Sequence, residues 1–222
     1  MLPFDELNIL NKKQSQRSIP IDRYFDEMDL PAGEKADRKA FAKKLEDKLF
    51  EIMALIYTVI ERNALGNIPM VIVRLEDELT SLVREYTVPD SELLDYINEY
   101  SVGFVDTTVK YAQYDEIEDE NDDVKTSYWF SEDRARYNAE NEANTIFNYE
   151  QFRQAKADGF TYKRWVTMKD ERVRRTHAEV DGVTIPIDDF FQVGDYLMRF
   201  PKDCENAGPE ECVNCRCVLT FL

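Results

Sequence analysis

The residues best suited to chemistry are four cysteines near the carboxyl end of the sequence. Cys204, Cys212, Cys215 and Cys217 follow the spacing C-x7-C-x2-C-x-C. A secreted disulfide scaffold spreads its cysteines along the chain, whereas this clustering indicates a local clip. The gap of two residues between Cys212 and Cys215 is typical of zinc knuckles.

A histidine adds a second kind of metal ligand. On a strand, Cys215 and Cys217 would point to the same face, which favours a shared ligand sphere over a disulfide between them. A structural tetrahedral zinc site could use all four cysteines, or three of them with His177, the one histidine of the chain. A local disulfide and ordinary reduced thiols remain alternatives, and a catalytic role for His177 is disfavoured because no nucleophile can be placed beside it.

A basic stretch precedes these cysteines in an otherwise acidic chain. It contains Lys163, Arg164, Lys169, Arg172, Arg174 and Arg175. Guanidinium groups bind carboxylates or phosphates through paired hydrogen bonds. One interpretation is an internal network in which Asp170, Asp181 or Asp203 pairs with arginines, and the other is a surface that contacts DNA or an acidic partner.

The motifs of the carboxyl-terminal part follow one another in a fixed order. They are Lys163-x-Trp165-x-Thr167-x-x-Asp170-x-Arg172-Val173-Arg174-x-x-His177-x-x-x-Asp181-Gly182, then Phe200-Pro201-x-Asp203, then Asn214-Cys215-Arg216-Cys217. This order resembles the phage Mu F-like head morphogenesis family, the MuF domain, over roughly residues 130–222. The resemblance implies structural roles for Trp165, Asp170, Arg172, Arg174, Asp181, Gly182, Pro201, Asp203, Asn214 and Arg216.

Two of the cysteines depart from the family pattern. Only Cys215 and Cys217 belong to it, so a site with all four cysteines would be a local elaboration. If these two share one face of a strand, Asn214 and Arg216 point to the other, where Arg216 could pair with Asp170 or Asp181.

The resemblance implies a minor head protein of a tailed bacteriophage rather than an enzyme. Such a protein is made in the bacterial cytoplasm and lies inside the virion head near the portal vertex, where it acts in head assembly and in DNA packaging or ejection. Its implied partners are the portal protein, the major capsid or scaffold protein and, weakly, packaged duplex DNA. The alternative is a small metal-dependent enzyme or a toxin-like MuF protein, a hydrolase or ADP-ribosyltransferase.

The composition and the absence of catalytic motifs exclude several classes of function. The net charge of -17 excludes a general DNA binder and disfavours a zinc-ribbon regulator, because phosphates repel an acidic surface. Among catalytic motifs we find no glycine-rich phosphate loop, no H-E-x-x-H and no G-x-S-x-G. No apolar run reaches the roughly 18 residues of a membrane span, so we expect no membrane contact.

The pattern of apolar residues predicts an α+β fold with a mainly helical amino-terminal region. Residues 1–34 are expected to form an extended arm, and residues 35–126 a helical region. Helices are predicted over residues 35–63, from Pro69 to about Tyr86, and after a cap at Asp90 or Ser91. The acidic run 114–126 should be a solvated loop.

The carboxyl-terminal module is expected over residues 127–222. It should open with an entry helix over 131–157 that ends near Gly159. A sheet module over 160–222 should follow, with a short antiparallel sheet. Its β-like runs span residues 160–168, 183–187 and 215–221.

Overall fold

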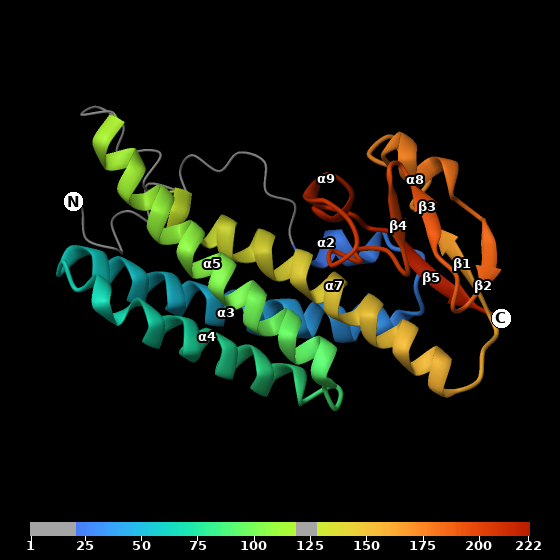
Figure 1. Cartoon of the computed structure of the whole chain (residues 1–222), viewed down its shortest axis with the longest axis horizontal. Helices are drawn as coiled ribbons and strands as arrows, with labels where there is room; N and C mark the ends of the chain where they lie inside the picture. Colours follow the sequence, from blue (N-terminus) through green and yellow to red (C-terminus); the bar gives the residue numbers. More distant parts are fainter. Residues whose placement is uncertain (1–20, 119–127) are drawn as a thin grey trace. The chain divides into compact units, whose positions relative to one another are not determined.

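The computed structural model describes residues 21–118 and 128–222, which divide into two compact units. Among these residues, unit 1 consists of Phe41–Ala139, and unit 2 combines residues 21–40 with Glu140–Leu222. Two long helices, α3 (Ala32–Glu61) and α7 (Glu132–Ala157), each contribute to both units (Figure 1). Of the described helices, none has the length and apolar character that a membrane crossing needs.

Unit 1 is helical, as the amphipathic pattern predicts. Besides its parts of α3 and α7 it contains the 3-10 turn η1 (Leu65–Asn67), α4 (Ile68–Val83) and α5 (Ser91–Glu118). Its fully buried side chains include Phe41, Leu45, Leu49, Met53, Ile56, Leu75, Leu79, Leu82, Ile97 and Val105. The predicted cap at Asp90 is confirmed, because the Leu93 amide donates to Asp90 Oδ1, and at the start of the predicted entry helix the Arg134 amide donates in the same way to Ser131 Oγ.

Unit 2 adds a small sheet to the ends of the two long helices. Strands β1 (Tyr162–Val166), β2 (Thr184–Pro186) and β5 (Val218–Phe221) form an antiparallel sheet in the order β2-β1-β5. Its register pairs Trp165 with Leu219 and Lys163 with Ile185. The predicted β-like runs therefore form one short antiparallel sheet.

Several short elements complete unit 2. Strands β3 (Phe191–Val193) and β4 (Tyr196–Met198) pair as a hairpin that the sequence analysis did not predict. Helices α8 (Arg175–Glu179) and α9 (Pro209–Cys212) are single turns. Helix α7 ends close to the predicted position, and Gly159 follows with a positive φ of 85°, as expected of a helix cap.

Two predicted boundaries differ from the structure. Residues 21–34 do not continue an extended arm, because helix α2 (Ile21–Asp26) and the start of α3 occupy them and bury Phe25 and Met28. The rest of the predicted arm, residues 1–20, lies outside the described residues. Residues 114–118 of the predicted acidic loop are helical instead, since α5 continues to Glu118 through residues that tolerate a helix; residues 119–127 lie outside the described residues.

Candidate metal centre

Three side chains in unit 2 converge into a cluster with the geometry of a metal site. His177 comes from α8, and Cys215 and Cys217 precede β5 directly. Their ligand atoms lie within 4.8 Å of one another, and each residue is at most 4% exposed. His177 Nδ1 is 3.3 Å from Cys217 Sγ and 3.5 Å from Cys215 Sγ.

These distances fit zinc. Zinc–sulfur bonds of about 2.3 Å and zinc–nitrogen bonds of about 2.0–2.1 Å place tetrahedral ligand atoms about 3.6 Å apart. The two nitrogen–sulfur separations are close to that value. The donor set of one imidazole and two thiols also suits zinc better than calcium or magnesium, which prefer oxygen. The residues present therefore fit a zinc ion.

The thiols and the imidazole change each other's protonation. Burial raises the pKa of the Cys215 thiol, but hydrogen bonds from Cys217 and His177 outweigh it and hold the pKa well below its ordinary value. Burial lowers the pKa of His177, but the hydrogen bond with Cys215 and the negative charges of Cys215 and Glu211 raise it overall. The cluster thus favours a thiolate at Cys215, the form that binds metal.

The backbone of the cysteine loop is held by amide side chains of α7. Asn144 Nδ2 donates to the Cys215 carbonyl at 2.9 Å, and Asn148 Nδ2 donates to the Cys217 carbonyl at 3.1 Å. Asn148 also donates to the Pro201 carbonyl at 3.0 Å, which ties the predicted proline turn to the same helix. Asn144 and Asn148 lie one helical turn apart, so both amides face the loop.

A fully buried arginine orients those amides. Arg38 on α3 donates to Asn144 Oδ1, to Asn148 Oδ1 at 3.1 Å and to Gln151 Oε1 at 2.8 Å. Burial lowers the pKa of its guanidinium to about 10, although the charge of Glu34 opposes this. The cysteine loop therefore rests on a polar network that reaches back to residues 34–38.

The remaining two cysteines lie outside this cluster. Cys204 is exposed, and its Sγ is 3.2 Å from the Lys202 carbonyl. Cys212 is buried, and its hydrogen bond with Cys204, together with burial, raises its pKa. Within the described chain, the metal-type cluster brings together His177, Cys215 and Cys217 without these two.

The predicted arginine–aspartate network surrounds the cysteine loop. Arg216 is largely buried and pairs with Asp170 at 2.7 Å, one of the two partners expected from its alternation with the cysteines. Arg172 pairs with Asp170 at 3.3 Å and also with Glu27. Burial raises the pKa of Asp170, but the hydrogen bond and charge of Arg216 outweigh this and lower it. These contacts support the internal network rather than a free basic surface.

The other motif residues shape the turns around the cluster. The Asp181 carboxylate accepts from the Thr167 amide at 2.9 Å, and Gly182 adopts a φ of 75° in the turn between β1 and β2. Asp203 is bound by the Arg199 guanidinium at 2.7 Å and by the Arg199 amide at 2.8 Å. Buried Trp165 meets the His177 ring edge-on, with centroids 5.6 Å apart.

Two further motif residues act through the backbone of this region. Arg174 donates to the Val213 carbonyl. Asn214 has a φ of 60°, and its amide donates to Asn141 Oδ1 at 3.1 Å. Both contacts fix the chain just before Cys215.

One residue of the predicted basic stretch lies in the interior. Lys163 is fully buried, because it shares the inward face of β1 with Trp165. Its Nζ lies 4.6 Å from the ring centre of Phe152 and 5.5 Å from that of Phe191. Burial, together with the charge of Lys156, lowers the pKa of this lysine to about 8. Lys163 therefore contributes to the interior and not to a basic surface.

Sequence reasoning also missed an acid beside the cluster. Glu211 Oε2 lies 2.9 Å from His177 Nε2, on the side of the ring that faces away from the thiols. The residue is 6% exposed, and Thr176 Oγ1 donates to the same oxygen at 2.8 Å. No metal-ligand spacing singles out Glu211, although its place beside Cys212 in a one-turn helix made it a neighbour of the cysteines in sequence.

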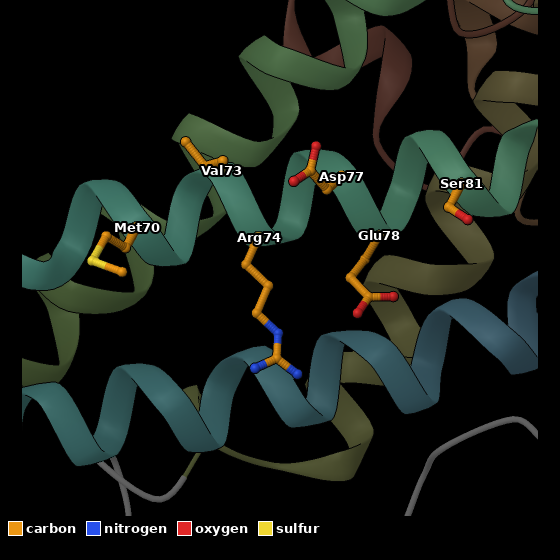
Figure 2. A pocket seen from close by; sticks show the side chains of 6 residues that line it. All are labelled: Met70, Val73, Arg74, Asp77, Glu78 and Ser81. Carbon is orange, nitrogen blue, oxygen red and sulfur yellow. The ribbon is translucent and has the colours of Figure 1, made fainter.

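Unit 1 carries a shallow groove of a different character. Figure 2 shows its lining on α4, where Arg74 and Glu78 point toward α3. Arg74 lies 3.6 Å from Glu51, and Glu78 pairs with Lys48. Met70 and Val73 are exposed beside them. These surface ion pairs contain no cluster of metal ligands or nucleophiles, so we place the candidate site in unit 2.

Comparison with known proteins matches the geometry to a family. The family model described as phage Mu protein F like protein matches residues 108–220, half of the chain. The matched segment includes His177, Cys215, Cys217 and every motif residue quoted above. No curated protein and no solved structure gives a significant match. The chain therefore belongs to the phage Mu protein F like family of bacteriophage proteins.

Proposed function

We propose that this chain is a minor head protein of a tailed bacteriophage whose unit 2 is fastened by a structural zinc ion. It lies inside the head near the portal vertex, binds the portal protein and acts in head assembly and in DNA packaging or ejection. Family membership supports the phage role. The single structural observation that carries the zinc is the buried cluster of His177, Cys215 and Cys217.

A structural role for the metal is favoured over a catalytic one. The three ligand residues are each at most 4% exposed, and the carbonyls of both cysteines are bound by α7 amides. Three protein ligands leave a fourth coordination position, and the burial of the cluster opposes the access of substrate that a catalytic site needs. A small unit with a short sheet also gains much from a metal clip in the reducing cytoplasm, where disulfides rarely persist.

The net charge supports a protein partner over free duplex DNA. Non-specific DNA affinity comes mainly from counterions released when lysine and arginine neutralise phosphates. This chain has a net charge of -17, and Arg172 and Arg216 are paired with acids. We therefore expect purified protein to bind its portal and to leave random duplex DNA unbound at physiological salt.

The zinc and the head role are tested with paired cysteine variants. We expect about one zinc per chain in the purified protein by elemental analysis, and loss of zinc in the double variant Cys215→Ser, Cys217→Ser. That variant should melt at a lower temperature and enter heads poorly, measured by mass spectrometry of purified virions. The matched double variant Cys204→Ser, Cys212→Ser should keep its zinc and enter heads.

Two results would contradict the proposal in separate ways. A metal-free native protein with four titratable thiols, together with unchanged melting temperatures in both double variants, would contradict the zinc site. Virions that contain no copies of the native chain, or normal heads produced without its gene, would contradict the role in the head. Hydrolase or transferase activity that depends on the metal would favour the enzyme alternative instead.

A further inference from the structure

The buried carboxylate of Glu211 lies on the side of His177 opposite the two thiols. His177 Nδ1 faces Cys217 and Cys215 at 3.3 and 3.5 Å, while Nε2 lies 2.9 Å from Glu211 Oε2. Only one of the two ring nitrogens can therefore face the metal. The geometry selects Nδ1 for the metal and leaves Nε2 to carry the proton.

We propose that Glu211 is a positioning residue of the metal centre, which fixes the tautomer and the direction of the His177 ring. This inference rests on the zinc proposed above. Metal-bound histidines generally donate their other ring N–H to a carboxylate, a carbonyl or water, and such partners raise metal affinity by orienting the ligand. Glu211 supplies that acceptor from α9, in the same segment that leads into Cys215.

The carboxylate is itself held in place. Thr176 Oγ1 donates to Glu211 Oε2 at 2.8 Å, and Thr176 precedes His177 on α8. Gly194, in the turn of the β3–β4 hairpin, lets the other oxygen approach, because a Cβ at that position would lie 2.8 Å from Glu211 Oε1. The hydroxyl and the turn together restrict the carboxylate to the side of the ring that bears Nε2.

The ring nitrogen needs this acceptor. In the described residues His177 Nε2 is buried and makes no fully aligned hydrogen bond, although Glu211 stands at hydrogen-bond distance. A buried N–H without an acceptor is costly, and so is a buried carboxylate without a donor.

The charge count is consistent with this role. A zinc ion with two thiolates and a neutral imidazole has no net charge, so the centre does not repel a nearby carboxylate. The polarised Nε2–H of a metal-bound imidazole then donates a hydrogen bond to the Glu211 carboxylate. Glu211 is placed behind the histidine, where it does not compete with the thiols for the ion.

The test measures zinc affinity by competition with a chromophoric chelator in the full chain. We expect Glu211→Ala to weaken zinc binding about 10–100-fold, and Glu211→Gln, which keeps an acceptor oxygen, to lose less. The matched control is Glu210→Ala, because Glu210 is the adjacent acid on α9, is exposed and binds the Tyr196 hydroxyl instead. We expect that control to bind zinc as the native chain does.

Spectroscopy separates positioning from ligation and from mere stability. Cobalt(II) bound to Glu211→Ala should keep the sulfur-to-metal charge-transfer bands of two thiolates. Because His177 is the one histidine in the chain, nitrogen NMR of labelled imidazole reads its tautomer without ambiguity. We expect metal at Nδ1 and a proton at Nε2, and faster exchange of that proton in Glu211→Ala.

Each contrary outcome is distinct. Metal at Nε2, equal loss of affinity in Glu210→Ala, or unchanged affinity and proton exchange in Glu211→Ala would overturn the positioning role while leaving the zinc centre intact. Loss of zinc as complete as in Cys215→Ser, Cys217→Ser would make Glu211 a direct ligand instead. A native chain that binds neither zinc nor cobalt would overturn the centre and the positioning role together.

Discussion

The two units bury different kinds of side chain. The interior of unit 1 is mostly aliphatic, with Leu75, Leu79 and Leu82 of α4 fully buried. It also buries the hydroxyls of Ser101, Thr108 and Ser131 and the charged Arg134, whose guanidinium lies 4.5 and 4.8 Å from the ring centres of Phe104 and Trp129. Unit 2 buries ionisable and amide groups throughout, including Arg38, Asn144, Asn148, Lys163, His177, Lys202, Asp203, Glu211 and Arg216.

This difference separates two ways of specifying a structure. An aliphatic interior depends on volume and tolerates swaps of similar size. A buried polar interior depends on the direction of each hydrogen bond, because every donor or acceptor left without a partner is costly. Unit 2 should therefore be intolerant of substitutions that unit 1 would accept, and the positions that define the family lie where direction matters.

The largest effect is expected from Arg38→Met. The change keeps the length of the side chain but leaves the oxygens of Asn144, Asn148 and Gln151 without their donor. We expect a loss of about 3–5 kcal/mol in the free energy of unfolding, because each buried oxygen left without a donor costs about 1–3 kcal/mol. Chemical denaturation followed by Trp165 fluorescence in a Trp129→Phe background measures it in unit 2.

The neighbouring position gives the control for that substitution. Lys39 forms an ion pair with Asp26 that is partly exposed, at 2.6 Å. Lys39→Met should cost at most about 1 kcal/mol, since exposed pairs contribute little. Equal losses at the two positions would mean that the buried network contributes no more than a surface pair.

A second substitution should stabilise unit 2 by removing a buried charge. The pKa of Lys163 is about 8 in the folded chain against 10.5 for an unperturbed lysine. Between these values the unfolded chain binds more protons, so stability rises with pH; below pH 8 the full cost, about 3 kcal/mol, is present. We expect Lys163→Met to raise the melting temperature at pH 7.

The pH dependence distinguishes this explanation from improved packing. The advantage of Lys163→Met should shrink as the pH rises from 8 toward 10.5, because folding then buries a neutral lysine, and above 10.5 the lysine is neutral in both states. Arg164→Met on the outward face of β1 is the control and should show no such trend. A gain that is constant from pH 7 to 10.5 would point to packing.

The smallest effect is expected from a conservative change in unit 1. Leu79 on α4 is fully buried among aliphatic neighbours. Leu79→Met keeps the volume and should cost less than about 1.5 kcal/mol, measured by thermal unfolding. A loss of unfolding free energy as large as that of Arg38→Met would show that both units depend equally on the exact side chain, which contradicts the difference between their interiors.

The sequence predicted the features that depend on local pattern. The helices predicted over residues 35–63 and 131–157, the cap at Asp90 and the helix end near Gly159 follow from spacing and residue type, and the structure contains them. Cys215 and Cys217 do converge with His177, although both precede strand β5 instead of lying on it as predicted.

What the sequence did not predict depends on contacts between distant segments. Helix α2 has too few residues to produce a clear periodicity, and its burial becomes visible only with the groups that cover it. The strands β3 and β4 have three residues each, too short for an alternation to be read. Glu211 acts through His177, 34 residues earlier, so no motif could connect the two. Lys163 could have been placed correctly, because it lies two residues before Trp165 on the same strand.

Unit 2 can form only late in synthesis, because its residues come from two segments that are far apart in the sequence. This unit joins residues 21–40 to Glu140–Leu222, and the Tyr24 hydroxyl donates to the Cys215 carbonyl across 191 positions of sequence. Residues Phe41–Ala139 of unit 1 all emerge before the sheet and the cysteine loop exist. During synthesis, Arg38 meets its partners only when α7 has been translated, and Tyr24 and Glu27 meet Cys215, Arg172 and Arg216 later still. The cysteine loop therefore joins unit 2 only after Cys217 has been translated, and a chain that stops before this residue contains His177 without both of its thiol neighbours.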